Sequence, residues 1–450
     1  MRQLLGVPAF VRLWLAAFFG ESAEWMLQVA LPVFLFATTG SAATTALSVV
    51  LGLLPAVLLS PVAGVVADRW DRRVVLAAVC VGQAVVALPL LAGDGIPVAL
   101  VYLVMAAQAG LASVFEPARN ALVPELVGVA EVTGANGLMS VNGSVARLAG
   151  GWAGGVLLGW GGLDRVVLGY LGALAVAAVL LARPFPGPAA PRARKPRREP
   201  VVAAWLAGLR ELTRDPRLRA TGIATVLVSV AQGMFLVLFV VFVLDVLGGS
   251  EADAGLLRGV QAIGGLAAGF AVATLARRVA GATLLAWGSL ATGLVSALIW
   301  NAAALTTALG LYVGLFAAAG GPAVVTGAGL LAHVQSVAAP DRAGRVLSTV
   351  FAVVAAAQAA GALLAGALVA VSGPAVLLDV QAGIYVVAGL VLLGWRKGGG
   401  SGDLPVGKWL RWRSAVSLRH QRPPRDPRGQ RADPRPRRAG FAGRLAARGR

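Results

Sequence analysis

Cysteine and histidine are nearly absent from this chain of 450 residues, which contains one Cys and two His. The single thiol, Cys80, cannot form a disulfide within the chain and excludes a metal site built on several thiolates. The two imidazoles, His333 and His420, leave almost nothing for zinc hydrolase or Ser-His-Asp chemistry. We therefore expect no enzyme, no cofactor and no metal centre.

Charged residues are also scarce, at 13% of the chain, whereas soluble proteins have about 25%. Hydrophobic residues make up 58%, and the mean hydropathy is +0.79. A soluble fold would have to expose much of this apolar surface, so a lipid bilayer is the expected solvent. The first apolar stretch contains Glu21 and Glu24 and continues to about Phe36. It is too long for a signal peptide and predicts a first membrane helix.

Apolar segments long enough to cross a bilayer, which takes about 20 helical residues, recur along the chain. They lie at about 10–36, 44–66, 74–92, 96–115, 136–159, 163–182, 218–246, 254–276, 281–300, 303–332, 345–371 and 374–395. This pattern predicts an all-α membrane protein with twelve transmembrane helices. We expect an N-terminal six-helix bundle over 1–182, a cytoplasmic basic linker over 183–217, a C-terminal six-helix bundle over 218–395 and a disordered basic tail over 396–450.

Lys and Arg are concentrated in every second connection between these segments. The positive-inside rule then places both termini in the cytoplasm and predicts a multi-pass protein of the plasma membrane. The tail, residues 396–450, carries sixteen Lys/Arg against three acids. We expect it to lie near anionic lipid headgroups, and we expect no nucleic-acid partner.

The second predicted span ends in GVVADRWDRR (64–73). This stretch resembles the G-x-x-x-D-R-x-G-R-R loop motif of the major facilitator superfamily, with Asp71 in place of the usual glycine. PARNALVPEL (117–126) and VAAPDRAGRV (337–346) resemble loops of its siderophore and macrolide exporters, the enterobactin-exporter-like subgroup. The resemblance runs from about residue 10 to 395 and implies two pseudo-symmetric six-helix bundles that alternate access to a central pocket. A monomer is expected.

The same resemblance implies a conformational latch at the cytoplasmic ends of the helices. Asp68 is expected to face the positive N-terminus of the eleventh helix, and Arg69, Arg72 and Arg73 are expected to pair between the two halves. An ordinary positively charged loop is the alternative. The residues assigned to the latch are Gly64, Asp68, Arg69, Arg72, Arg73, Arg119 and Arg345.

The fifth predicted helix contains ARLAGGWAGG (146–155), which resembles a degraded antiporter motif. Gly150, Gly154 and Gly155 match that motif, and Gly151 replaces its proline. Small residues here would let helices pack tightly and limit leak, although generic small-residue packing explains them nearly as well.

Charged residues in the middle of predicted spans are the sharpest sign of a functional site. A charge at a helix centre costs about 2.5–3.5 kcal/mol by insertion scales, so it is retained in a cavity or as a pair. We expect Glu24 and Arg147 to be electrostatically coupled, with Glu24 carrying a proton; a static ion pair is the alternative. Arg258 and Asp245 are expected near the outer ends of two helices, where Arg258 extends to the interface; an external gate formed by the two is the alternative. The residues assigned to proton coupling or the substrate cavity are Glu21, Glu24, Trp25, Gln28, Arg147, Gln232 and Phe235.

These features together predict a secondary active transporter that exports a small amphipathic molecule, such as a drug, antibiotic or siderophore, by proton antiport. Its expected partners are that small molecule, protons and membrane lipids. Uptake or lysophospholipid flipping by the same fold is one alternative. A non-transporting membrane sensor or scaffold is another.

Overall fold

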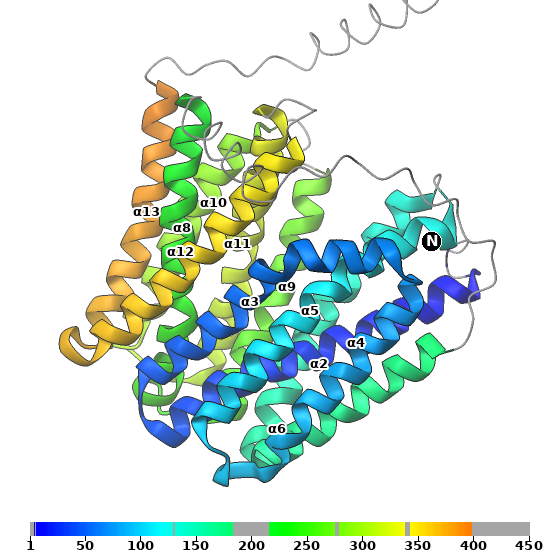
Figure 1. Ribbon diagram of the computed structural model, residues 1–450. Helices are drawn as coiled ribbons and strands as arrows, with labels where there is room; N and C mark the ends of the chain where they lie inside the picture. The colour runs from blue at the N-terminus through cyan, green and yellow to red at the C-terminus, as the bar shows by residue number, and fades with distance from the viewer. Residues whose placement is uncertain are drawn as a thin grey trace, which may run out of the picture. The chain divides into compact units, whose positions relative to one another are not determined.

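The computed structural model describes residues 4, 6–128, 131–182, 216–274, 279–337 and 343–397, and this part of the chain is almost entirely helical (Figure 1). The predicted linker and tail fall almost wholly outside it. The elements are α2 (Pro8–Thr39), α3 (Ala42–Arg69), α4 (Arg72–Ala87), η1 (Leu88–Gly95), α5 (Val98–Val127), α6 (Val132–Ala182), α8 (Pro216–Val241), η3 (Phe242–Val246), α9 (Glu251–Thr274), α10 (Gly281–Ala302), α11 (Leu309–Val337), α12 (Ala343–Ser372) and α13 (Pro374–Lys397).

Within these described residues, 10 helices are long and apolar enough to cross a membrane. One of them, α6, has 51 residues and consists of two spans, because Gly161 and Gly162 depart from helical geometry between them. The 32-residue α2, which carries Glu21 and Glu24, is not among the 10 but is also long enough to cross. Counting α2 and dividing α6 gives the twelve predicted spans, so the predicted fold class is confirmed.

Short connections between the helices depend on residues suited to helix ends. Gly40 ends α2 with a φ of 62°, in the left-handed region that glycine tolerates, and donates its N–H to the carbonyl of Phe36. Asp71 begins α4: its carboxylate accepts the backbone N–H of Arg73 at 2.9 Å and of Val74 at 3.4 Å. This helix-capping role gives a physical reason for an aspartate where the family motif has glycine.

The helices are arranged in two groups, α2 to α6 and α8 to α13, which we call the first and the second half (Figure 1). In the first group, α6 packs closely along α2 because α6 has glycines, which lack a side chain, at the points of contact. A Cβ added to Gly154 would lie 2.6 Å from the carbonyl oxygen of Met26, and one on Gly150 would lie 2.9 Å from the Cβ of Trp25. No larger residue fits at either position without moving α2.

The next face of α6 contacts the other half of the molecule. A Cβ on Gly155 would lie 2.6 Å from the Cα of Gly255 in α9, and one on Gly151 would lie 3.5 Å from the Cα of Gly259. A second contact joins α3 to α12, where a Cβ on Gly366 would lie 2.6 Å from the Cβ of Ala46. These contacts involve the first turns of α3 and α9 and the end of α12. We call this the closed side of the molecule.

Replacing Gly155 with valine is expected to force α6 and α9 apart. Overpacking of this kind costs about 1–3 kcal/mol, so the purified protein should melt at a lower temperature. Gly172→Val is the matched control, because a Cβ at that exposed position meets nothing within 4 Å. Equal melting temperatures for the two variants would contradict a close helix contact at Gly155.

Candidate substrate and coupling site

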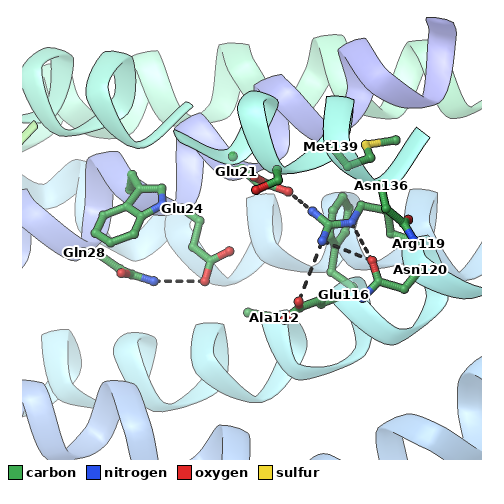
Figure 2. A pocket seen from close by; sticks show the side chains of 13 residues that line it. Glu21, Glu24, Gln28, Ala112, Glu116, Arg119, Asn120, Asn136 and Met139 are labelled. Carbon is green, nitrogen blue, oxygen red and sulfur yellow. Dashed lines mark hydrogen bonds and ion pairs between the residues drawn. The ribbon is translucent and has the colours of Figure 1, made fainter. Parts of the chain in front are cut away.

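A pocket of about 620 Å³ opens between α2, α5 and α6 in the first half of the molecule (Figure 2). Its described lining combines three carboxylates and one guanidinium with apolar side chains. The lining residues are Glu21, Glu24, Trp25, Gln28, Ala112, Phe115, Glu116, Arg119, Asn120, Asn136, Met139, Ser140 and Gly143. It therefore brings together four of the seven residues assigned to the cavity from the sequence.

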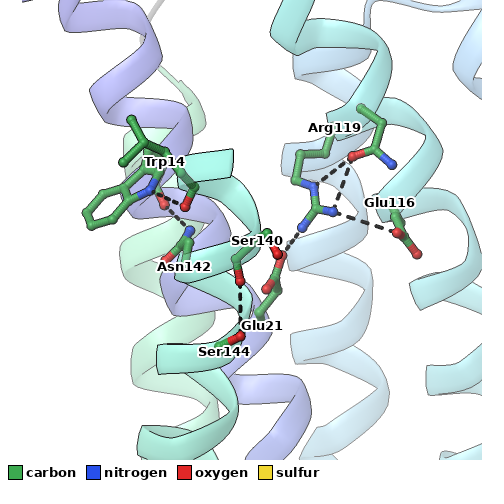
Figure 3. A network of polar contacts seen from close by, with 9 residues as sticks. Trp14, Glu21, Glu116, Arg119, Ser140, Asn142 and Ser144 are labelled. Carbon is green, nitrogen blue, oxygen red and sulfur yellow. Dashed lines mark hydrogen bonds and ion pairs between the residues drawn. The ribbon is translucent and has the colours of Figure 1, made fainter. Parts of the chain in front are cut away.

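One wall of this pocket is held by an ion pair between Glu21 of α2 and Arg119 of α5 (Figure 3). Their side chains are only 16% and 13% exposed. Arg119 also lies 3.8 Å from Glu116 and donates two N–H groups to the Asn120 side-chain oxygen at 3.2 and 3.3 Å. In this conformation Arg119 therefore pairs with a carboxylate of its own half, and its role in a latch between the halves stays a prediction.

Glu24 lies one helical turn from Glu21 but has different surroundings. Its carboxylate accepts a hydrogen bond from the Gln28 amide at 2.9 Å, and it makes no ion pair with any residue that the structure describes (Figure 2). Glu24 also lines a second pocket of about 240 Å³ inside the first half, together with Glu116. The two carboxylates therefore lie where the two pockets adjoin.

The second pocket is bounded by a chain of neutral hydrogen-bonding groups. Tyr170 of α6 donates its hydroxyl to the Gln108 side-chain oxygen at 3.0 Å, and the Gln108 amide donates to the backbone carbonyl of Gln83 at 2.8 Å. Sequence reasoning did not assign any of the three to the site. Tyrosine itself was the available signal: the chain has only 4, and each donates its hydroxyl to an oxygen in the structure.

Arg147 is not paired with Glu24, contrary to the prediction from their depth in the membrane. Its guanidinium carbon lies 5.6 Å from the centre of the Trp25 ring, an arrangement that stabilises a cation by the ring's negative face. Gly265 of α9 makes room for it, since a Cβ there would lie only 3.4 Å from an Arg147 nitrogen. Arg147 thus reaches toward the other half, while Glu24 lines the pockets in its own half.

Gln232 and Phe235 lie in the second half and do not line either of the two pockets. Gln232 accepts a hydrogen bond from the Tyr385 hydroxyl at 2.8 Å. The centre of the Phe235 ring lies 6.2 Å from that of the Trp300 ring. The guanidinium carbon of Arg258 lies over the Phe235 ring, 5.3 Å from its centre. The prediction that Arg258 extends to the membrane interface was wrong, because aromatic rings hold its guanidinium inside the protein.

Two of the predicted latch arginines, Arg72 and Arg73, make their described contacts within the first half and not between the halves. Arg72 pairs with Glu125 and donates to the carbonyl of Ala121 at 3.0 Å. Arg73 donates to the carbonyl of Ala182 at 3.1 Å. On the closed side the halves touch at the opposite end of α3, which leaves these arginines to neighbours in α5 and α6. The remaining latch side chains fall outside the described part of the chain: Gly64, Asp68, Arg69 and Arg345.

Twelve spans in two groups that meet on one side, with a polar pocket between helices, are the architecture of transporters that work by alternating access. The chain matches the Major Facilitator Superfamily over residues 13–357 and belongs to that family. A curated relative, the uncharacterized MFS-type transporter YfiS of Bacillus subtilis (strain 168), is 27% identical over 128 residues. That match covers 28% of this chain and 30% of the relative's length.

Solved structures with very different cargoes share the fold. The nucleoside transporter NupG superposes with a TM-score of 0.66 at 14% identity, over 86% of this chain and 98% of its own. A bacterial homologue of the iron transporter ferroportin, in its inward-facing state, gives 0.65 at 17% identity, over 86% and 98%. The POT family transporter PepTSo gives 0.69 at 11% identity, over 88% and 99%. At these identities the likeness concerns the fold alone.

The Glu21–Arg119 pair provides a test of the site's electrostatics. Removing one partner of a buried pair leaves an uncompensated charge and costs about 3–5 kcal/mol, whereas removing both costs much less. Arg119→Gln and Glu21→Gln should each lower the melting temperature strongly, and the double variant should recover most of the loss. Additive losses in the double variant would contradict a direct pairing.

Proposed function

We propose that this transporter exports a small amphipathic molecule in exchange for protons and that Glu24 carries the proton. The observation that carries the proposal is the position of Glu24, whose carboxylate lies where the two pockets adjoin and has no ion-pair partner among the described residues. Ionisable side chains inside a membrane mark proton relays and substrate pathways in transporters. Glu21 is less suited to this role because Arg119 already compensates its charge.

The lining of the larger pocket supports an amphipathic substrate. Trp25, Phe115 and Met139 offer apolar surface, while Asn120 and Ser140 offer hydrogen-bonding groups. A volume of about 620 Å³ falls in the range of small-molecule pockets. The pocket therefore suits a drug-sized molecule with both apolar and polar parts.

The proposed direction of transport, export, rests on two exporter-like sequence segments and on the predicted cytoplasmic position of both termini. PARNALVPEL (117–126), which the structure places in the last turns of α5, and VAAPDRAGRV (337–346) resemble segments of exporters. If both termini are cytoplasmic, the closed side faces outward and the larger pocket is reached from the cytoplasm. An exporter loads its substrate in that state.

Glu24→Gln is expected to abolish proton-coupled transport while leaving the fold intact, because the amide keeps the hydrogen bond to Gln28 but cannot exchange a proton. The measurement is substrate accumulation in proteoliposomes with and without an imposed pH gradient, starting from a screen of cells that contain or lack the protein. Glu131→Gln is the matched control, since that carboxylate lines neither pocket.

Two results would count against the proposal. Gradient-driven transport that persists undiminished in Glu24→Gln would remove Glu24 as the proton carrier. Substrate that accumulates against the expected direction in the same vesicles would favour uptake over export.

A further inference from the structure

Two arginines from opposite halves of the molecule meet at one tryptophan ring. Arg147 of α6 lies 5.6 Å from the centre of the Trp25 ring, and Arg258 of α9 lies 6.0 Å from the same centre. Gln261 and Gly265 follow Arg258 at helical spacings on one face of α9. Arg258 contacts Gln261 at 3.3 Å, and Arg147 reaches Gly265, so both guanidiniums lie along this face.

Neither guanidinium has a carboxylate partner in the part of the chain that the structure describes. The three ion pairs found there involve Arg72 and Arg119 instead. Arg147 makes no hydrogen bond to a described residue, and its Nε is fully buried. Among the described residues, Arg258 donates one hydrogen bond, to the Gln261 side-chain oxygen at 3.3 Å, and lies over two aromatic rings.

Two like charges held close together inside a membrane protein are costly unless an anion joins them. A guanidinium has five N–H donors arranged to bind a carboxylate or sulfonate through two parallel hydrogen bonds. Residue by residue, Arg147 and Arg258 both have intermediate exposure, so neither is completely enclosed by protein. The described residues thus supply the donors and the positive charge of an anion site, and none of their carboxylates pairs with it.

Trp25 connects this arginine pair to the larger pocket. Its ring contacts both guanidiniums and also lines the 620 Å³ pocket beside Phe115 and Met139. This arrangement suits a molecule that has a negatively charged group at one end of a flat apolar body. The charged group would bind the two arginines, and the apolar body would lie along Trp25.

We infer that Arg147 and Arg258 form the binding site for the anionic group of the transported substrate, an amphipathic organic acid. This rests on the proposed transport function and adds the substrate's charge to it. Because Arg147 belongs to the first half and Arg258 to the second, a bound anion bridges the two halves. It thereby stabilises the conformation in which the closed side is shut.

Equilibrium binding tests this without any ion gradient. The full-length protein in neutral detergent is titrated with 1-naphthoate and with 1-naphthalenemethanol, which has the same ring system but no charge, and heats of binding are recorded. The naphthoate should bind at least about tenfold more tightly, as expected for charge-assisted hydrogen bonds. Arg147→Gln and Arg258→Gln should each lower the affinity for naphthoate about tenfold. The affinity for 1-naphthalenemethanol should stay unchanged in both variants.

Arg165→Gln is the matched control, because Arg165 is exposed and lies away from both pockets. Arg258→Lys should retain part of the affinity by keeping the charge. Competition with lysophosphatidylglycerol, set against lysophosphatidylcholine, distinguishes a lipid headgroup from a soluble acid as the source of the anion. Displacement by the anionic lipid alone would overturn the assignment to a soluble acid.

Several results would overturn the anion site itself. These are equal affinities for the acid and the alcohol, tighter binding of 1-naphthylmethylamine than of the acid, or naphthoate binding that survives both glutamine variants. The first two comparisons use the unmodified protein, so they hold even if a variant fails to fold. Because no gradient is involved, a failure here is separate from a failure of proton-coupled transport.

Discussion

Close backbone contact on two neighbouring faces of α6 is the constraint on which the rest of the structure depends. Gly150 and Gly154 let this helix approach α2, and Gly151 and Gly155 let it approach α9 in the other half. In lipid, where apolar side chains gain little by leaving the solvent, such contacts rely on close packing. One helix therefore joins its own bundle and seals the closed side. It also carries Arg147 one turn beyond the seal, where the halves meet around Trp25.

The distribution of charge follows from the same geometry. Glu21 and Arg119 lie within one bundle and compensate each other, which lets both remain inside the membrane. Glu24 lies a turn further along α2 and meets only the Gln28 amide. Arg147 and Arg258 lie against aromatic rings instead of acids. The site thus separates an acidic wall, suited to protons, from a pair of cations at the contact between halves.

Family membership and substrate are decided at different levels. A nucleoside transporter, a POT family transporter and a homologue of an iron transporter share this fold at 11–17% identity. The fold provides two bundles and a pocket between helices, which alternating access requires. The cargo depends on the few side chains that line the pocket, and these vary independently of the scaffold.

The sequence by itself determined the membrane class, the positions of most spans and the family, because hydropathy and loop motifs are local properties of the chain. Length and apolarity were enough to predict the separate spans at 136–159 and 163–182, which α6 joins through Gly161 and Gly162. The sequence also singled out Glu21, Glu24 and Trp25, because a polar group inside an apolar span is visible without a structure.

Only the tertiary structure decided which groups meet. Depth in the membrane suggested that Glu24 pairs with Arg147, yet Arg119 reached Glu21 and Trp25 received Arg147. Arg258 looked like a residue at a helix end, but the position of α9 against α6 brings it under the Trp25 ring. Pairing of this kind depends on helix rotation and on contacts between residues far apart in the chain. A one-dimensional pattern does not encode either of these, so partners could not be assigned from spacing.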